Sequence, residues 1–363
     1  MTVLTRRTLN RTLLERQFLL ERADVGAAEV VGRLVAVQGQ ECNAPYVGLR
    51  ARVSGFERDE LAGLLHDRAV VRGATLRGTQ HLQLAADFGL MRPLLATLFA
   101  RIGRTGFGTA IEGIEPDEFV AAVRESMTGR VLTRPELGRL LAERFPGRDA
   151  KALGWMAHFL VGLLHPPPSG MWGSWWSRGA VPCVLAEEWA PEAAREEASA
   201  GELVLRYLAG HGPATVADVQ TWSGLTRLKP VVDALRPKLR TYRDEDGREL
   251  FDLADAPLAN PDAPAPVRLL PNFDNLVLAH RDRTRVITDE HRRVVMPGYS
   301  QVLPTFLVDG FVAGTWEVSK TALTFRPFER LAPADAEALH AEAERLLAFV
   351  TDEDAPPRTI VHA

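Results

Sequence analysis

Through residue 253, apolar positions recur three or four residues apart, and paired short strands interrupt this helical pattern three times. The first series predicts helices over 9–21, 26–38, from Asn43, over 56–66 and over 85–102, with a hairpin over 69–82. The second predicts helices over 116–127, from Thr133 and from Asp149 to Leu164, with strands over 172–176 and 181–186. The third predicts helices over 191–209, 216–222 and 228–235, with strands over 239–244 and 249–253. Helices followed by two strands are typical of a winged helix-turn-helix unit.

The pattern changes after residue 253. A stretch rich in Pro, Ala and Asp over 254–266 indicates a linker. Short strands are then predicted over 267–270, 276–280, 286–287, 294–296, 305–308, 311–318 and 323–327. An amphipathic helix over 333–350 closes the chain, with a loose tail from Thr351.

These patterns predict an α+β protein with three tandem winged helix-turn-helix units, a β-rich C-terminal region and a final helix. The expected domains are 1–104, 105–190 and 191–258 for the three units and 259–363 for the C-terminal region.

Composition excludes several protein classes. The 363 residues are 46% hydrophobic and 25% charged, with a formal net charge of −4, which is ordinary for a globular protein. No apolar run approaches the roughly 20 residues that a membrane span needs, and the start of the chain has no secretory signal. The two cysteines, Cys42 and Cys183, form no disulfide framework, so we expect a cytoplasmic protein, associated with the nucleoid if it binds DNA.

Arginine dominates the basic residues, because only four of the 43 are lysines. Arg281, Arg283 and Arg285 alternate along a predicted strand, so their side chains are expected on one face, close to Arg292 and Arg293. Such a face suits phosphate contacts. The alternative is a set of surface ion pairs with the interleaved acidic residues, which would contribute little.

Several motifs occur in a defined order along most of the chain. They are Leu34-Val35-Ala36-Val37-Gln38-Gly39-Gln40, Pro45-Tyr46-Val47-Gly48-Leu49, Arg77-Gly78-Thr79-Gln80-His81, Leu270-Pro271-Asn272-Phe273-Asp274, Arg281-Asp282-Arg283 and Val308-Asp309-Gly310-Phe311. The ordered set resembles the AlkZ-type winged-helix DNA glycosylase family of bacteria. The resemblance implies three winged helices around a concave, duplex-sized channel. It also implies hydrolysis of the glycosidic bond of N7-alkylated purines, including bulky adducts and interstrand crosslinks, and in some members a role in antibiotic self-resistance.

The resemblance assigns catalysis to Gln38 and Gln40, while Gly39 departs from the aliphatic residue that the family motif carries between them. An N7-alkylated purine already bears a positive charge and leaves readily, so the protein has to hold a water at C1′ and stabilise a developing sugar cation. A carboxamide oxygen does both. With Gln38 at the end of a helix and Gln40 just beyond it, both side chains are expected to project from one junction. Two solvated or capping glutamines are the alternative interpretation.

Four further residues are candidates for the pocket. Asn43 and Tyr46 flank the glutamines, and Thr79 and His81 are expected on the same side of one strand. Tyr46 suits base stacking, but core packing is the preferred interpretation; for His81, pocket and packing roles stand equal. Trp172, Trp175 and Trp176 are interpreted as packing between units rather than as a stacking platform.

No motif indicates a metal site or a cofactor, and no lysine near the glutamines offers a Schiff-base nucleophile. His158 and His165 are interpreted as core histidines. The resemblance implies a DNA glycosylase acting on double-stranded DNA, and with these absences we expect it to be monofunctional and monomeric, with no cofactor and no membrane partner. The alternative is a non-catalytic winged-helix regulator. The turns Pro297-Gly298-Tyr299, which is preferred, and Asp309-Gly310 are candidates for the groove-binding hairpin that the resemblance implies.

Overall fold

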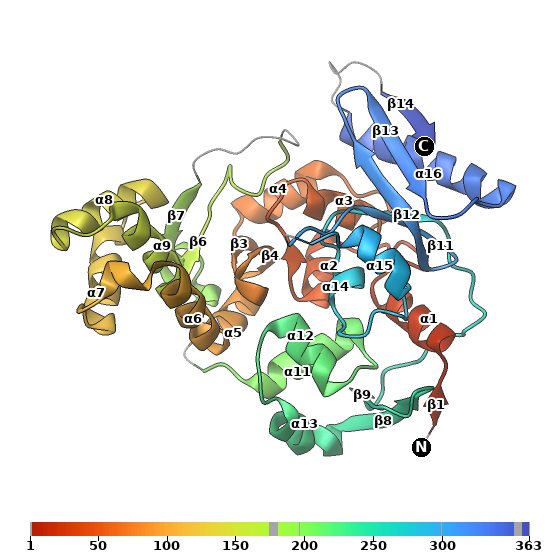
Figure 1. Ribbon diagram of the computed structural model, residues 1–363, viewed down its shortest axis with the longest axis horizontal. Helices are drawn as coiled ribbons and strands as arrows, with labels where there is room; N and C mark the ends of the chain where they lie inside the picture. Colours follow the sequence, from red (N-terminus) through yellow and green to blue (C-terminus); the bar gives the residue numbers. More distant parts are fainter. Residues whose placement is uncertain (1, 174–180, 196, 299, 352–357, 363) are drawn as a thin grey trace.

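The computed structural model describes residues 2–173, 181–195, 197–298, 300–351 and 358–362 and has a mixed α and β fold (Figure 1). The first elements are β1 (Val3–Leu4), α1 (Arg6–Arg16), α2 (Ala27–Leu34), β2 (Val37–Gln38), α3 (Ala44–Arg50), α4 (Arg58–His66), β3 (Val70–Ala74), β4 (Gln80–Leu84), α5 (Ala85–Leu94) and α6 (Ala96–Phe107). Next come α7 (Pro116–Met127), β5 (Leu132–Thr133), α8 (Arg134–Arg144), α9 (Ala150–Leu160), β6 (Leu163–Leu164), β7 (Pro182–Leu185) and α10 (Ala186–Trp189).

The second half begins with α11 (Ala200–His211), α12 (Val216–Ser223), α13 (Lys229–Leu235), β8 (Leu239–Asp244) and β9 (Glu249–Leu253). The C-terminal region contains β10 (Arg268–Leu270), α14 (Asn275–Leu278), α15 (Asp289–Val295), β11 (Thr305–Val308), β12 (Phe311–Val318), β13 (Ala322–Pro327), α16 (Pro333–Val350) and β14 (Thr359–His362). Helices α7 and α8 lie at one end of the molecule, and α16 with the C-terminal strands lies at the other (Figure 1).

Local signals place α7, the start of α8 and the closing helix α16 well. Helices α7 and α16 have the predicted bounds. Helix α8 begins at a capping box in which the Thr133 hydroxyl accepts from the Glu136 amide and the Glu136 carboxylate accepts from the Thr133 amide at 2.8 Å. These elements are confirmed because their boundaries depend on neighbouring residues alone.

Strands from both predicted wings share one sheet, but the first strand of the second wing is β6, at 163–164 rather than 172–176. The helix predicted from Asp149 to Leu164 therefore ends earlier, at Leu160. The order of the sheet is β2-β4-β3-β6-β7-β5, and the junction is the pairing of Gly73 in β3 with Leu164 in β6. The third hairpin, β8-β9, instead pairs with β1. The division into units at residues 104 and 190 stays a prediction, but strands from both sides of the first boundary form this sheet.

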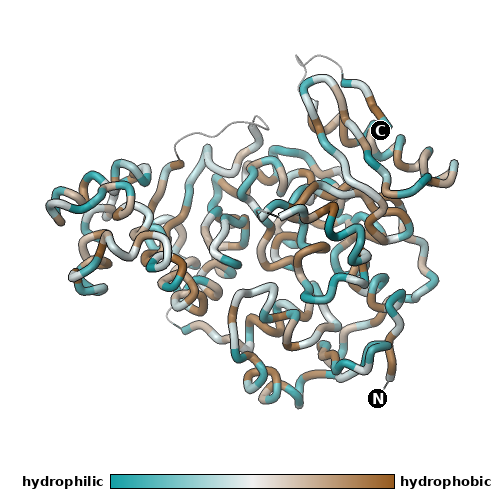
Figure 2. The backbone as a smooth tube through the Cα atoms, in the orientation of Figure 1, coloured by the Kyte–Doolittle hydropathy of each residue, from teal (hydrophilic) through white to brown (hydrophobic). Residues whose placement is uncertain are grey.

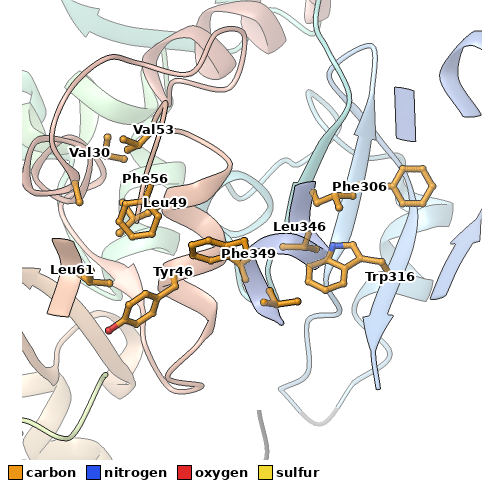
Figure 3. Packing of buried hydrophobic residues seen from close by; sticks show 14 of the residues in the cluster. Val30, Tyr46, Leu49, Val53, Phe56, Leu61, Phe306, Trp316, Leu346 and Phe349 are labelled. Carbon is orange, nitrogen blue, oxygen red and sulfur yellow. The ribbon is translucent and has the colours of Figure 1, made fainter. Parts of the chain in front are cut away.

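The largest core joins the first helices to the C-terminal region. Tyr46 and Phe56 pack towards Phe349 of α16, and the same cluster continues to Trp316 and Phe306 of the C-terminal sheet (Figure 3). Figure 2 shows hydrophobic residues concentrated towards the middle of the molecule and alternating with hydrophilic ones along the peripheral helices. The C-terminal sheet and α16 therefore support the segment that carries the glutamines.

The helix predicted over 26–38 is wrong at its end. Helix α2 stops at Leu34, Val35 has a φ of +67°, and Gln38 lies in β2, opposite His81 of β4. Gly39 does not have the positive φ expected of a left-handed helix cap. The pairing with β4, in which Gln38 lies opposite His81 more than 40 residues further along the chain, draws this segment out of the helix that its apolar spacing predicts.

Three C-terminal strands are also wrong. Residues 276–280 and 294–296 fall in or beside the short helices α14 and α15, and the Arg281–Arg285 segment is irregular. Side-chain caps explain the helices, because Asp274 accepts from the Leu276 amide at 2.9 Å and Thr288 accepts from the His291 amide at 3.2 Å. Residues 286–287 form no strand either.

Other corrections are smaller. Helix α1 is capped by Thr5 rather than Thr8, the helix predicted over 191–209 begins only at Ala200, and the helix predicted over 85–102 is two helices, α5 and α6. Within the tail expected from Thr351, residues 359–362 form β14, which pairs in parallel with β13.

Candidate active site at the glutamine turn

Gln38 and Gln40 lie at a turn that leaves the edge of the shared sheet. Gln38 is 6% exposed, whereas Gln40 is exposed. The Gln38 Oε1 atom accepts from the Gln40 backbone amide at 2.6 Å, and its Nε2 atom donates to the Thr79 hydroxyl at 3.4 Å. Gln40 Oε1 accepts a long hydrogen bond from the Gln80 amide at 3.5 Å. The pair is therefore asymmetric, since the buried Gln38 carboxamide is held by its own turn and the exposed Gln40 side chain is held only loosely.

Gly39 is held on both sides. Its amide donates to the Gln80 carbonyl at 2.9 Å, and its carbonyl accepts from Arg72 Nε at 3.0 Å. A Cβ atom at this position would lie 3.3 Å from the Leu82 backbone nitrogen, so glycine permits the close approach of the turn to β4. The departure from an aliphatic residue at Gly39 thus accompanies a tight contact with the sheet.

His81 is fully buried opposite Gln38 in the sheet. Its Nδ1 atom lies 2.9 Å from the Thr79 carbonyl, so Nδ1 carries the proton and Nε2 is left as an acceptor. Nε2 has no hydrogen-bond partner among the described residues. Burial and the positive charge of Arg77 lower the pKa of His81 to about 3, which keeps the ring neutral and excludes it as a proton donor near pH 7.

Asn43 and Tyr46 lie beside the turn but are engaged in packing. Asn43 Nδ2 donates to the Gly173 carbonyl at 2.9 Å, and the Gly173 amide donates back to Asn43 Oδ1 at 3.1 Å. Tyr46 is fully buried, edge-on to Trp172 at a centroid distance of 5.5 Å, and burial raises its pKa to about 12. Trp172 also packs on Phe349, as expected of a residue between units. Trp175 and Trp176 lie outside the described residues.

The five arginines do not form the single face that the sequence predicts. Arg285 is buried and donates to the Pro213 carbonyl at 2.9 Å, and Arg292 pairs with Asp289 at 3.2 Å. Arg283 is half-buried, with its Nε atom unpaired among the described residues, while Arg281 and Arg293 are exposed. Because the segment is irregular, alternation along a strand does not align the five side chains.

Of the two candidate turns, Asp309-Gly310 joins β11 and β12 and packs on α1. Arg7 Nη1 donates to Asp309 Oδ2 at 2.7 Å, and Arg11 pairs with the same carboxylate. Tyr299, in the other candidate turn, lies outside the described residues.

Within the described ranges, no group of His, Cys, Asp or Glu side chains is arranged to hold a metal ion. His158 and His165 are buried and stacked on each other with centroids 5.6 Å apart. No helix in the described part of the chain has the length and apolarity to cross a bilayer.

The sequence interpretation gave no role to two arginines near the turn, buried Arg72 and half-buried Arg77. Arg72 contacts Gly39 as above, and Arg77 Nη1 donates to the Trp222 carbonyl of α12 at 2.9 Å. The signal for Arg72 was present in the sequence, because a single charged residue interrupts the apolar run of β3.

What the turn offers chemically is a pair of carboxamides beside neutral His81, with the Arg72 guanidinium bound to the carbonyl of the residue between them. The Gln40 oxygen retains acceptor capacity beyond its long contact with the Gln80 amide, and the Gln38 oxygen retains one lone pair beyond the Gln40 amide. Such groups bind water or a cation and cannot act as strong acids.

Comparison with known proteins shows the family and the fold. A family model described as "DNA glycosylase AlkZ-like" matches residues 31–349. A Streptomyces sahachiroi protein described as "Interstrand DNA cross-link repair glycosylase" is 27% identical over 364 aligned positions, covering 91% of this chain and 92% of the relative. The solved structure of Streptomyces sahachiroi DNA glycosylase AlkZ has the same fold, with a TM-score of 0.81 and 23% identity over 99% of this chain and all of that one.

Proposed function

The chain belongs to the AlkZ-like DNA glycosylase family, and from this premise we propose that it hydrolyses the N-glycosidic bond of N7-alkylated purines in duplex DNA. The observation that carries the proposal is the turn at which Gln38 and Gln40 project from the sheet edge. The name of the Streptomyces sahachiroi relative supports an extension to interstrand crosslinks, whose bonds have the same chemistry when they pass through N7.

The proposed mechanism needs no acid. The cationic base leaves as oxocarbenium character develops on the sugar, and the exposed Gln40 carboxamide accepts a hydrogen bond from the attacking water at C1′. The remaining lone pair of Gln38 lies towards the same turn and adds negative potential beside the sugar. Neutral His81 adds no positive charge that would oppose the developing cation.

We further propose that the three helix-and-hairpin series act as winged-helix units lining a concave channel for duplex DNA. Exposed Arg281 and Arg293 would contact phosphates, with half-buried Arg283 beside them. We expect a monomer that needs no cofactor. Neutralised phosphates release counterions, so affinity should fall steeply between about 50 and 200 mM salt.

Release of free 7-methylguanine from alkylated duplex DNA tests the proposal directly. The expected product is an intact abasic site, with no adduct trapped by borohydride, because no lysine takes part. A crosslinked duplex tests the wider substrate range through the appearance of separated strands. Duplex binding without release of any base would instead identify a non-catalytic DNA-binding protein and contradict the proposal.

A further inference from the structure

Arg72 is a buried cation in an apolar strand. Its residue is 6% exposed, and all five residues of β3 are buried. Within the described part of the chain, no carboxylate lies in ion-pair distance of its guanidinium, although Glu41 is near enough to raise its pKa slightly against the dominant lowering by burial. Burying a charge without an ionic partner is unfavourable. The hydrogen bonds of Arg72 therefore have to offset this cost, and they indicate why the residue is there.

Those hydrogen bonds lead to the glutamine turn. Arg72 Nε donates to the Gly39 carbonyl at 3.0 Å, and Nη1 donates to the Ser169 hydroxyl at 2.8 Å. Gly39 is the residue between the two glutamines, and its amide is already fixed by the Gln80 carbonyl. The orientation of both peptide groups around Gly39 is therefore set by hydrogen bonds from the sheet.

Residues 165–173, which follow β6 in the second unit, hold Arg72 in turn. The His165 amide donates to the Arg72 carbonyl at 2.8 Å, and Gly170 lies against the Arg72 side chain. At the far end of this segment, Gly173 exchanges two hydrogen bonds with Asn43, three residues after Gln40. The segment thus contacts the turn from both sides, through Arg72 and through Asn43.

The groups around the guanidinium do not compete for it. Burial lowers the pKa of His165 to about 4 and raises the pKa of Cys183 to about 11, so both are neutral near pH 7. His158 is neutral for the same reason. The Nε and Nη1 groups of Arg72 therefore donate only to the Gly39 carbonyl and the Ser169 hydroxyl, which have fixed positions.

We propose that Arg72 is a positioning residue of the glycosylase, which fixes the Gly39 carbonyl and with it the orientation of Gln38 and Gln40, and that residues 165–173 of the second unit hold Arg72 in place. This inference rests on the proposed function. Arg72 touches neither water nor DNA in the proposed reaction, and it acts through the turn. A catalytic group displaced by about 1 Å can lose roughly 100-fold in rate, so loss of this contact should affect the chemical step.

The test compares Arg72→Met with Arg92→Met. Arg92 is also a buried arginine, and its Nη2 donates to the Phe159 and Val161 carbonyls at 2.6 and 3.1 Å, far in sequence from the glutamines. Arg72→Met should lower the single-turnover rate of 7-methylguanine release about 10- to 100-fold while the dissociation constant for duplex DNA changes less than about threefold. Arg92→Met should leave the rate within about threefold of wild type, although both variants lose thermal stability.

Two further variants sharpen the result. Arg72→Lys should recover part of the rate, because an ammonium group can donate to the Gly39 carbonyl but lacks the rigid fork that also reaches Ser169. Ser169→Ala should cause a smaller loss than Arg72→Met. Equal rates in wild type and folded Arg72→Met, or equal losses in the Arg72 and Arg92 variants, would overturn the proposal.

Backbone amide exchange keeps the inference testable if wild type releases no base, an outcome that would refute the proposed function alone. The amides of Gly39 and Gln40 donate to the Gln80 carbonyl and Gln38 Oε1. Their exchange should be at least about tenfold faster in Arg72→Met and unchanged in Arg92→Met. The same exchange rates at these two amides in both variants would show that Arg72 does not position the turn.

Discussion

The glutamine turn and the arginine-rich segment 281–293 both carry polar side chains proposed to meet DNA, but different contacts hold them. At the turn, polar groups are fixed by backbone atoms, as in the contacts of Gln38 with the Gln40 amide and of Arg72 with the Gly39 carbonyl. In the segment, Arg292 pairs with the Asp289 carboxylate, and Arg281 and Arg293 are exposed, while buried Arg285 donates to the Pro213 carbonyl.

The difference separates two roles. A group fixed by backbone atoms of a sheet has one orientation, which suits a site where a water must be held at a defined point. A cation beside exposed carboxylates keeps side-chain freedom and contributes mostly long-range attraction. Substitutions at the turn should therefore change the rate of base release, and substitutions at exposed arginines should change affinity.

The largest effect is expected at the glutamines. Gln38→Ala and Gln40→Ala should each lower single-turnover release of 7-methylguanine by roughly 10- to 1,000-fold, the scale of losing one positioning or electrostatic group. The double variant should lose less than the product, because both side chains serve one water. Gln40→Asp should remain active, since a carboxylate also accepts from water. Wild-type rates in both alanine variants would disprove the carboxamide mechanism.

Within the arginine segment, Arg285→Met should act on stability. Its guanidinium is buried, and its loss leaves the Pro213 carbonyl without this donor, at a cost of about 1–3 kcal/mol. Denaturant unfolding measures this loss, while duplex affinity of the folded fraction should be unchanged. A fall in duplex affinity with unaltered stability would show that Arg285 contacts DNA and would contradict this prediction.

Joint replacement of exposed Arg281 and Arg293 by Ala should have the opposite signature. Duplex affinity should fall by roughly tenfold across sequences, and the slope of log affinity against log salt should decrease by about 1 per lost phosphate contact. Titration at several salt concentrations gives both quantities. An unchanged slope would show that Arg281 and Arg293 contact no phosphate. Arg330→Ala, a substitution of another exposed arginine, is the matched control.

The smallest effect is expected from pH. Burial lowers the pKa of His81 to about 3 and raises that of Tyr46 to about 12, so both remain neutral between pH 6 and 9. The single-turnover rate should vary by less than about twofold over this range. A rate that falls as pH rises through about 6.5 would reveal a protonated histidine acting in the reaction.

Stability should depend on pH even though the rate does not. The pKa values of five buried histidines, His81, His158, His165, His211 and His280, are lowered in the folded protein. The unfolded chain therefore binds more protons, so stability is fully present above about pH 6.5 and is lost as pH falls towards the folded pKa values. Unfolding at pH 7 and pH 5 should differ by more than about 2 kcal/mol, the contribution of one such histidine.

The sequence by itself determined the elements whose signals are local. Helical spacing and a proline in the first turn gave α7 and α16 their bounds, a capping box gave α8 its start, and the Asp309-Gly310 pair marked the turn between β11 and β12. The ordered motifs led to the family, and through it to Gln38 and Gln40 as the proposed catalytic pair, because this inference needs residue identity and spacing alone.

Tertiary structure decided what depends on residues far apart in the chain. Pairing with β4 placed Gln38 in a strand rather than at a helix end, and the junction of Gly73 with Leu164 merged two hairpins into one sheet. Burial separated Arg285 from its exposed neighbours and brought Arg72 to the carbonyl of Gly39. Local propensity cannot report such contacts, because their free energy comes from sheet pairing and desolvation, which arise only when distant segments pack together.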